Sequence, residues 1–193
     1  MKKVFLVICV LFISGDLFAQ WNPGKFEFSA SGSFSSQYYS EEYNSTASNS
    51  DTYSSFTTSL RIGYFITYYI ELEPEIMVLS STIDSPVYSL NGNISYNIKT
   101  GSNFVPFILV GFGIGNGMPV NFVGRDLVRT SDSFNVESLN AGAGVKIFIS
   151  GDIALRVEYR FQRYYQSVQS TWNYDVKDIT TSHKVLFGIS VFL

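Results

Sequence analysis

Apolar and polar side chains alternate along most of the chain after residue 20, with a period of two residues. In the final stretch, 183–193, every second position from Val185 onward is apolar, and the positions between them include Lys184, Gly188 and Ser190. Because side chains of a β-strand point alternately to opposite faces, this stretch predicts a strand with one apolar face. No window after residue 20 has the apolar spacing of an amphipathic helix, so we expect an all-β chain.

The alternation predicts eight antiparallel strands joined by alternating long and short connections. The strands are expected at 25–36, 53–66, 69–80, 87–100, 105–115, 134–149, 153–166 and 183–193. Short turns are expected at 67–68, 101–103 and 150–152, and longer connections at 37–52, 81–86, 116–133 and 167–180. An unpaired strand edge invites aggregation, so the last strand is expected to pair with the first and close a barrel. Long loops at one end and short turns at the other are typical of an up-and-down transmembrane barrel.

The choice between a soluble and a membrane barrel depends on which face is inside. A soluble lipocalin-like barrel also has eight strands, but it hides its apolar face. Here the polar face is rich in small Ser, Gly and Asn residues, which suit a narrow interior. On the apolar face, Phe56 and Tyr64, like Tyr88 and Tyr96, are spaced to span roughly 20 Å of height at a tilt of ~40°, close to the ~25 Å apolar band between aromatic girdles. We therefore expect the apolar face to meet lipid.

The first residues resemble a secretory signal peptide. Lys2 and Lys3 precede an apolar run that ends near Ile13, and Ala19 offers a small residue for cleavage. The alternative is a transmembrane helix, but the run is too short to cross ~30 Å of hydrocarbon. We expect residues 1–19 to be the signal peptide and residues 20–193 to form one barrel domain. The single cysteine, Cys9, lies in this leader, so the mature chain is expected to have no disulfide.

Composition adds little to the choice of function. Aromatic residues make up 17% of the chain and charged residues only 15%, and the formal net charge is −3. A chain with this charge offers no basic surface for nucleic acid, and we expect none as a partner.

Side chains at alternate positions of a strand share a face, and we call this relation parity. By parity, ten ionisable side chains fall on the inward face. The five acids and five bases of this lumen charge network are Glu27, Arg61, Glu71, Glu73, Glu75, Lys146, Arg156, Glu158, Arg160 and Lys184. Charges in a narrow interior must pair or be hydrated, since an unpaired buried charge is very costly. They either fill the barrel with salt bridges, which we favour because the signs balance, or line a gated ion path. A glycosidase pair or a metal site is disfavoured because the arginines compete for the carboxylates. We expect no metal and no cofactor.

Three further features of the sequence bear on its chemistry. His183 lies beside Ser182, but adjacent strand residues point to opposite faces, so the two do not form a nucleophile and base, and no catalytic residue is assigned. His183 is expected on the outer face near a membrane interface. The glycines between 111 and 117 lack nucleotide-binding spacing and are expected to make room for long inward side chains. Pro74 is expected to mark a bulge or a local irregularity of its strand.

Several segments together resemble a known family. They are Ile70–Glu75, Pro106–Gly115, Leu139–Val145, Leu155–Tyr159 and His183–Leu193. In this combination the chain resembles the small eight-stranded outer-membrane barrels of the OmpX and OmpA-transmembrane-domain type, over nearly all of residues 20–193. The family's closing strand usually ends in an aromatic residue, whereas here Phe192 is penultimate. The resemblance implies insertion into the bacterial outer membrane by the assembly machinery, contact with its lipids and a monomeric state.

The function expected from the sequence is that of an integral outer-membrane barrel with a filled lumen. Its role would be structural or adhesive, through loops 37–52, 116–133 and 167–180, which are expected to meet host or envelope surface ligands. The alternative is a narrow channel for small solutes or ions. We expect no enzymatic activity.

Overall fold

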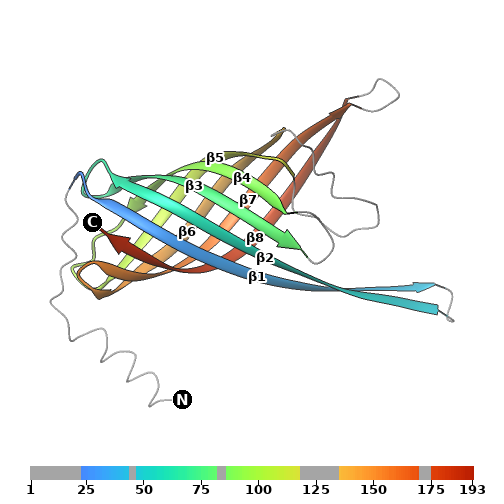
Figure 1. Cartoon of the computed structure of the whole chain (residues 1–193), viewed down its shortest axis with the longest axis horizontal. Coiled ribbons are helices and arrows are strands. Elements are labelled where there is room, and N and C mark those ends of the chain that lie inside the picture. Colours follow the sequence, from blue (N-terminus) through green and yellow to red (C-terminus); the bar gives the residue numbers. More distant parts are fainter. Residues whose placement is uncertain (1–22, 44–46, 82–85, 118–134, 170–174) are drawn as a thin grey trace, which may run out of the picture.

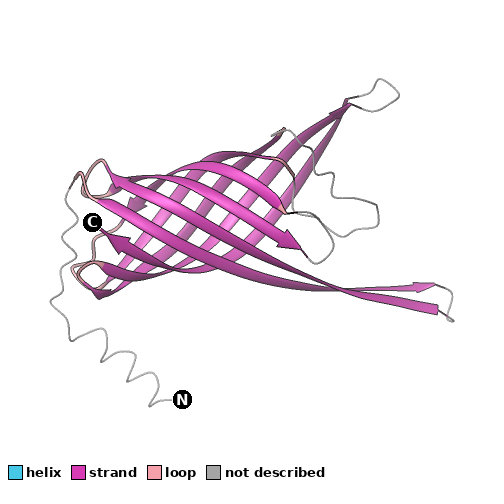
Figure 2. Cartoon of the chain, viewed as in Figure 1, coloured by secondary structure: helices cyan, strands magenta, loops and turns pink. Residues whose placement is uncertain are grey.

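Eight antiparallel strands form one closed barrel in the computed structural model, which describes residues 23–43, 47–81, 86–117, 135–169 and 175–193 (Figures 1 and 2). The strands are β1 (Phe26–Tyr43), β2 (Ala47–Phe65), β3 (Ile70–Ser81), β4 (Val87–Asn97), β5 (Phe104–Gly115), β6 (Val136–Ser150), β7 (Ile153–Gln169) and β8 (Asp175–Phe192). The predicted eight-stranded all-β barrel is confirmed. Within the described ranges, no helix is long and apolar enough to cross a membrane. The expected signal peptide, residues 1–19, lies outside these ranges and stays a prediction.

The apolar side chains face outward, as the alternation predicted. Along β4 every residue alternates between buried and exposed. The expected girdle residues Phe56, Tyr64, Tyr88 and Tyr96 are all between 41% and 51% exposed on the outer surface. The polar and charged partners in the alternation are buried inside the barrel. This inversion of a soluble core is expected only if the outer surface meets lipid.

Two hairpins continue well beyond the predicted strand ends. The β1–β2 ladder runs without a break from Phe26↔Tyr64 to Tyr43↔Ala47, so the predicted loop 37–52 is wrong for residues 37–43 and 47–52, which are strand, while residues 44–46 lie outside the described ranges. The β7–β8 ladder likewise reaches Gln169↔Asp175, which replaces most of the predicted loop 167–180. The sequence did not signal these extensions, because alternation of apolar and polar residues disappears once neither face needs to be apolar. Most of the predicted loop 116–133 lies outside the described residues.

Short turns join the strands at the opposite end. The β2–β3 turn is held by Thr67, whose Oγ1 accepts hydrogen bonds from the backbone N–H of Tyr69 (3.2 Å) and Ile70 (2.9 Å). The β4–β5 connection contains Gly101 with a φ of 70°, a conformation that favours glycine. We call this the short-turn end, and the end with the two extensions the long-hairpin end (Figure 1). The C-terminus lies at the short-turn end (Figure 1).

Pro74 leaves the register of its strand unchanged. The pairs Leu72↔Tyr64 and Glu75↔Arg61 belong to one continuous register with β2, although the two positions between them are not paired. A bulge at Pro74 is therefore wrong, and the local irregularity is a gap in the ladder, which fits a residue that has no N–H to donate. The register shift of the barrel occurs instead between Phe148 and Ser150, beside the β6–β7 turn.

The seam between the first and last strands is short. β1 pairs with β8 only from Glu27↔Phe192 to Gly32↔Phe187. At its base the backbones of Phe26 and Leu193 exchange two hydrogen bonds, of 2.9 and 3.2 Å. Above Gly32 the two strands diverge, β1 continuing with β2 and β8 with β7 (Figure 1). The barrel is thus closed at the short-turn end and splayed at the long-hairpin end.

A charge placed on the outer face tests its contact with lipid. Leu60 is 55% exposed and lies midway along β2 between the girdle residues Phe56 and Tyr64. Leu60→Arg should lower the free energy of unfolding in lipid vesicles by about 2–4 kcal/mol, because the guanidinium would sit near the bilayer midplane. Ile66→Arg, on the same face at the short-turn rim, is the matched control and should lower it by only about 0–1 kcal/mol. Urea titration of both variants gives the comparison, and equal costs would contradict a lipid-facing surface.

Candidate functional site

An apolar floor closes the lumen at the short-turn end. It consists of Phe65, Val105, Phe148, Ala154 and Phe192, each no more than 5% exposed. The ring centre of Phe192 lies 5.0 Å from that of Phe148 and 6.3 Å from that of Phe65. These side chains come from the ends of β2, β5, β6, β7 and β8 and meet across the barrel axis. Water has no polar surface to follow through this layer.

Nine of the ten inward charges predicted from the sequence meet directly above the floor. We call this set the ion-pair network, and every member is at most 3% exposed. It contains Glu27, Glu71, Glu73, Glu75 and Glu158 with Arg61, Lys146, Arg156 and Arg160. Because these residues come from β1, β2, β3, β6 and β7, the network ties opposite walls of the barrel together.

Glu158 is the centre of the network. Its carboxylate forms ion pairs with Arg61 (2.6 Å), Arg156 (3.0 Å) and Arg160 (2.5 Å). Arg61 and Arg160 both reach Glu75 as well, at 2.7 and 2.5 Å. One carboxylate therefore holds three guanidinium groups, and two of these share a second carboxylate. Such connected pairing is what makes burial of so many charges tolerable.

A second group of contacts anchors the network to the floor. Lys146 Nζ forms ion pairs with both Glu27 and Glu71, the latter at 2.7 Å. The same Nζ lies 5.5 Å from the ring centre of Phe65 and 5.7 Å from that of Phe192. Arg156 then links Glu27 (3.3 Å) to the rest of the network. The ammonium group is thus held between carboxylates above and aromatic faces below.

Lys184 is the predicted charge that the structure does not bring into the ion-pair network. Its side chain faces the lumen as expected, but among the described residues no carboxylate lies within 4 Å of its Nζ, so the ion-pair network contains five acids and four bases. Its Nζ donates instead to Gln162 Oε1 (2.9 Å) and Tyr164 Oη (3.4 Å). In the β7–β8 ladder Lys184 pairs with Arg160, a member of the ion-pair network, but its ammonium contacts neutral acceptors.

A layer of amides separates Lys184 from the carboxylates. Gln162 Nε2 donates to Asn140 Oδ1 (2.8 Å), and Asn140 Nδ2 donates to Asn91 Oδ1 (3.1 Å). Asn93 Nδ2 completes the connection by donating to Glu75 Oε2 (3.0 Å). The amide layer therefore continues the hydrogen-bonded filling of the barrel above the ion-pair network.

Glycines on β5 give these amides their space. A Cβ on Gly113 would lie 2.0 Å from Asn91 Oδ1, and a Cβ on Gly111 would lie 2.1 Å from Asn93 Oδ1. No side chain fits at either position while the asparagines keep their places. The expectation that this glycine row makes room for inward side chains is confirmed.

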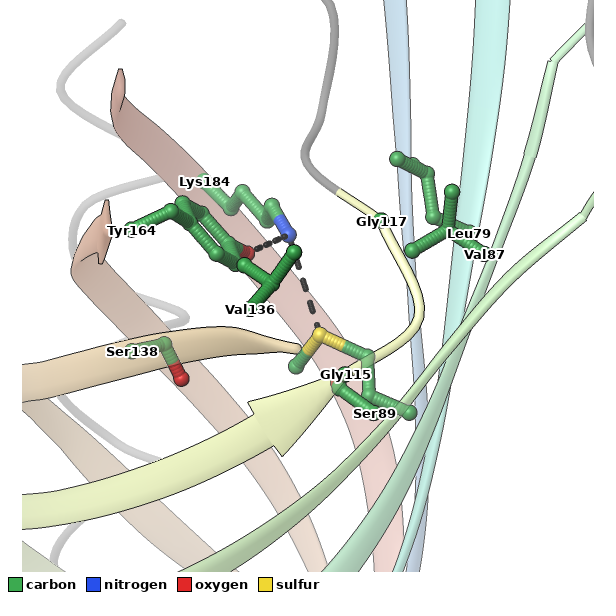
Figure 3. Close-up of a pocket in the computed structure, with 10 residues that line it drawn as sticks. Leu79, Val87, Ser89, Gly115, Gly117, Val136, Ser138, Tyr164 and Lys184 are labelled. Atoms are coloured by element: carbon green, nitrogen blue, oxygen red, sulfur yellow. Dashed lines mark hydrogen bonds between the residues drawn. The ribbon is translucent and has the colours of Figure 1, made fainter. Parts of the chain in front are cut away.

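A small cavity lies above the amide layer, towards the long-hairpin end. Figure 3 shows Lys184, Tyr164 and Val136 close together on one side of it and Val87 on the other. Met77 also lines the cavity. The cavity has room for about one water molecule. Lys184 Nζ points towards Tyr164 Oη and Met77 Sδ in this view (Figure 3).

His183 lies outside the lumen, as expected from parity. It is exposed on the outer face of β8, and its Nδ1 lies 2.6 Å from the hydroxyl of Tyr159 on β7. Its ring also meets Phe161 edge-on at 5.3 Å. Ser182 is paired with Gln162 and does not share that face. Within the described ranges, no group of His, Cys, Asp or Glu residues is arranged to hold a metal ion.

The sequence reasoning did not identify the apolar floor or the amide layer. A signal for the floor was present, because Phe65, Phe148 and Phe192 are each the middle residue of three consecutive apolar residues at a strand end. Such a triplet means that both faces of the strand are apolar at that level. The amides carried no comparable signal, since inward asparagines were indistinguishable from generally polar positions.

Comparison with known proteins supplies the wider context. The family model described as "Outer membrane protein beta-barrel domain" matches residues 5–188. The crystal structure of Neisserial surface protein A (NspA) is similar, with 17% identity, a TM-score of 0.57, and coverage of 87% of this chain and 96% of that one. The N-terminal β-barrel domain of Pseudomonas aeruginosa OprF has 15% identity, a TM-score of 0.50, and coverage of 88% and 98%. These two likenesses show the fold. No curated protein matches the chain.

Removal of one carboxylate charge tests whether Glu158 contributes more to the stability of the barrel than Glu71 does. Glu158→Gln should lower the free energy of unfolding by about 3–5 kcal/mol, because it leaves three buried arginines short of a partner. Glu71→Gln is the matched control within the same network. Glu71 forms an ion pair with Lys146 alone, and the network has five acids for four bases, so this change should cost no more than about 2 kcal/mol. Urea titration in lipid vesicles measures both, and a larger cost for Glu71→Gln would refute this hierarchy.

Proposed function

The chain belongs to the outer membrane protein beta-barrel domain family, and from this premise we propose that it is a closed barrel of the bacterial outer membrane with a structural or adhesive surface role. The long-hairpin end would face the outside of the cell, and the short-turn end the periplasm, as in other barrels of this architecture. Its binding partners would contact residues that extend beyond the membrane, and the lumen would take no part in binding.

The filled lumen is the observation that carries this proposal. From the short-turn end upward, the axis is occupied by the apolar floor, the ion-pair network and the amide layer. An eight-stranded barrel has an interior about as wide as its side chains, so little space remains between these layers. A solute crossing the barrel would have to break several buried ion pairs, and this argues against steady conduction.

The extended hairpins support a role at the cell surface. Beyond the outward residues Phe34 and Phe56, the β1–β2 ladder continues from Ser35↔Ser55 to Tyr43↔Ala47. At ~3.4 Å per residue, this is an extension of roughly 30 Å along the strands. A paired hairpin of this length presents backbone and side chains far from the bilayer at a small entropic cost. It is suited to contact with host or envelope surface ligands.

The partners of the barrel follow from the same surfaces. Its outward apolar side chains, such as Leu60 and Val110, fit outer-membrane lipids. We further propose that the assembly machinery inserts the barrel, with β8 as the closing strand, and that the protein is a monomer because the eight strands form a closed ring within one chain.

A narrow channel is the second candidate. The cavity beside Lys184 favours it, because a cation near the outer mouth with room for about one water molecule could begin a path for small ions. Such a path would still require the ion-pair network to open.

Epitope tags test the orientation. A short tag inserted after Asn44, between β1 and β2, should be recognised by antibody on intact cells, since that connection would lie outside. The same tag inserted after Gly101, in the β4–β5 connection, is the control and should be recognised only after the outer membrane is permeabilised. The reverse pattern would refute the proposed surface role of the hairpins.

Conductance in planar bilayers tests the closed lumen. The purified wild-type protein should show no steady pore. The double variant Arg156→Ala with Arg160→Ala should show a leak that prefers cations, because five carboxylates would then share two bases and water would enter to hydrate them. Heat-dependent gel migration would first establish that the variant is folded.

A charge removed outside the lumen provides the control for that experiment. Arg163 is exposed on the outer face of β7, so Arg163→Ala changes net charge without touching the network. It should leave the bilayer silent. A stable, sizeable wild-type conductance that the double variant leaves unchanged would replace the closed-barrel proposal with the channel.

A further inference from the structure

Ionisable groups are rare on the outer face and gather on one side of the barrel. Among strand residues whose side chains the structure describes, acidic, basic or imidazole groups point outward at Glu137, Arg163 and His183. All three are exposed, and they lie on the adjoining strands β6, β7 and β8 towards the long-hairpin end. A lipid-facing surface places such groups only where headgroups can reach them.

Arg163 and His183 are neighbours on that face. Arg163 pairs with Thr181 across β7 and β8, and His183 pairs with Phe161 one step closer to the short-turn end. Their positions are therefore diagonal on the same face, at a separation of about 7–8 Å. A long arginine side chain and an imidazole can converge on a single tetrahedral anion across this distance.

Local contacts leave both groups with donors for an anion. The hydroxyl of Tyr159 lies 2.6 Å from Nδ1 of His183, and when this hydroxyl donates, the imidazole keeps its proton on the opposite nitrogen, Nε2. The guanidinium of Arg163 lies 5.6 Å from the ring centre of Tyr165. Among the described residues, no carboxylate lies within 4 Å of Arg163; the nearest by register is Glu137, which pairs with Tyr165.

An apolar track continues from these groups towards the middle of the barrel. Val185 and Phe187 follow His183 on the outer face of β8 and are 45% and 63% exposed. Tyr159 is 49% exposed beside them on β7. The patch thus offers hydrogen-bond donors at one end and a hydrocarbon surface at the other, which matches an amphiphile with an anionic head and acyl chains.

We propose that Arg163 and His183 form a binding site for the phosphate group of a lipid in the outer leaflet. The guanidinium donates two hydrogen bonds to phosphate oxygens, and His183 Nε2 donates a third, while the acyl chains lie along Val185 and Phe187. The site rests on the proposed orientation of the barrel for its leaflet, but its chemistry can be measured in detergent, where orientation plays no part.

Native mass spectrometry of the folded protein in detergent tests the site. The probe is an acylated diglucosamine lipid with two phosphates, compared with the same lipid after enzymatic dephosphorylation. Wild-type protein should bind the phosphorylated lipid at least roughly tenfold more tightly, as expected for charge-assisted hydrogen bonds. The double variant Arg163→Gln with His183→Gln should lose this preference and remain folded, since both side chains are exposed.

Lys99→Gln is the matched control, because Lys99 is an exposed cation at the opposite rim, 4.6 Å above the ring of Tyr68. It should keep the wild-type preference. Equal binding of the two lipids by wild-type protein, or an equal loss in Lys99→Gln, would overturn the site in favour of general attraction to an interface. Displacement of the lipid by millimolar inorganic phosphate would also overturn it, since the site would then recognise phosphate without the acyl chains.

Discussion

Burial of charge inside a narrow lumen is the constraint on which this barrel depends. Glu158 and its three arginines lie in a space where an unpaired charge would be very costly. Arg156 and Arg160 reach Glu158 along β7, and Arg61 reaches it from β2 on another wall. Those partners are supplied by β2 and β7 together, and the carboxylates of β3 join them. The pairing requirement therefore fixes the relative positions of strands that share no backbone hydrogen bonds.

The remaining layers adapt the interior to this network. The phenylalanines of the floor give Lys146 an aromatic surface on the side away from its carboxylates. The amide layer ends the network on the other side, because asparagine and glutamine can accept and donate at once. Glycine at position 113 is required on the facing strand, since any larger residue would displace Asn91. Outside, the same strands are mostly apolar, so one alternation places polar side chains in the lumen and apolar side chains against lipid.

The sequence predicted most of the architecture because parity is a local property. Arg61 follows Leu60, and the opposite exposures of these two side chains were readable from their types alone. What could not be read depends on neighbours in other strands. Parity places Lys184 on the inward face with the network. It does not say which inward side chains lie within reach of the Lys184 ammonium. The extended part of β1 was missed because a hairpin in water needs no apolar face, and its backbone pairing leaves no mark in the alternation.

The short seam between β1 and β8 has a kinetic consequence. Every other junction joins strands that are consecutive in the chain, so each can zip outward from a turn. The seam alone joins the two ends of the domain, Phe28 to Val191, and it does so with the shortest ladder in the barrel. Contacts between such distant residues close the largest loop and form slowly. We therefore expect ring closure to limit the rate of assembly, and we expect the finished barrel to open first at this seam.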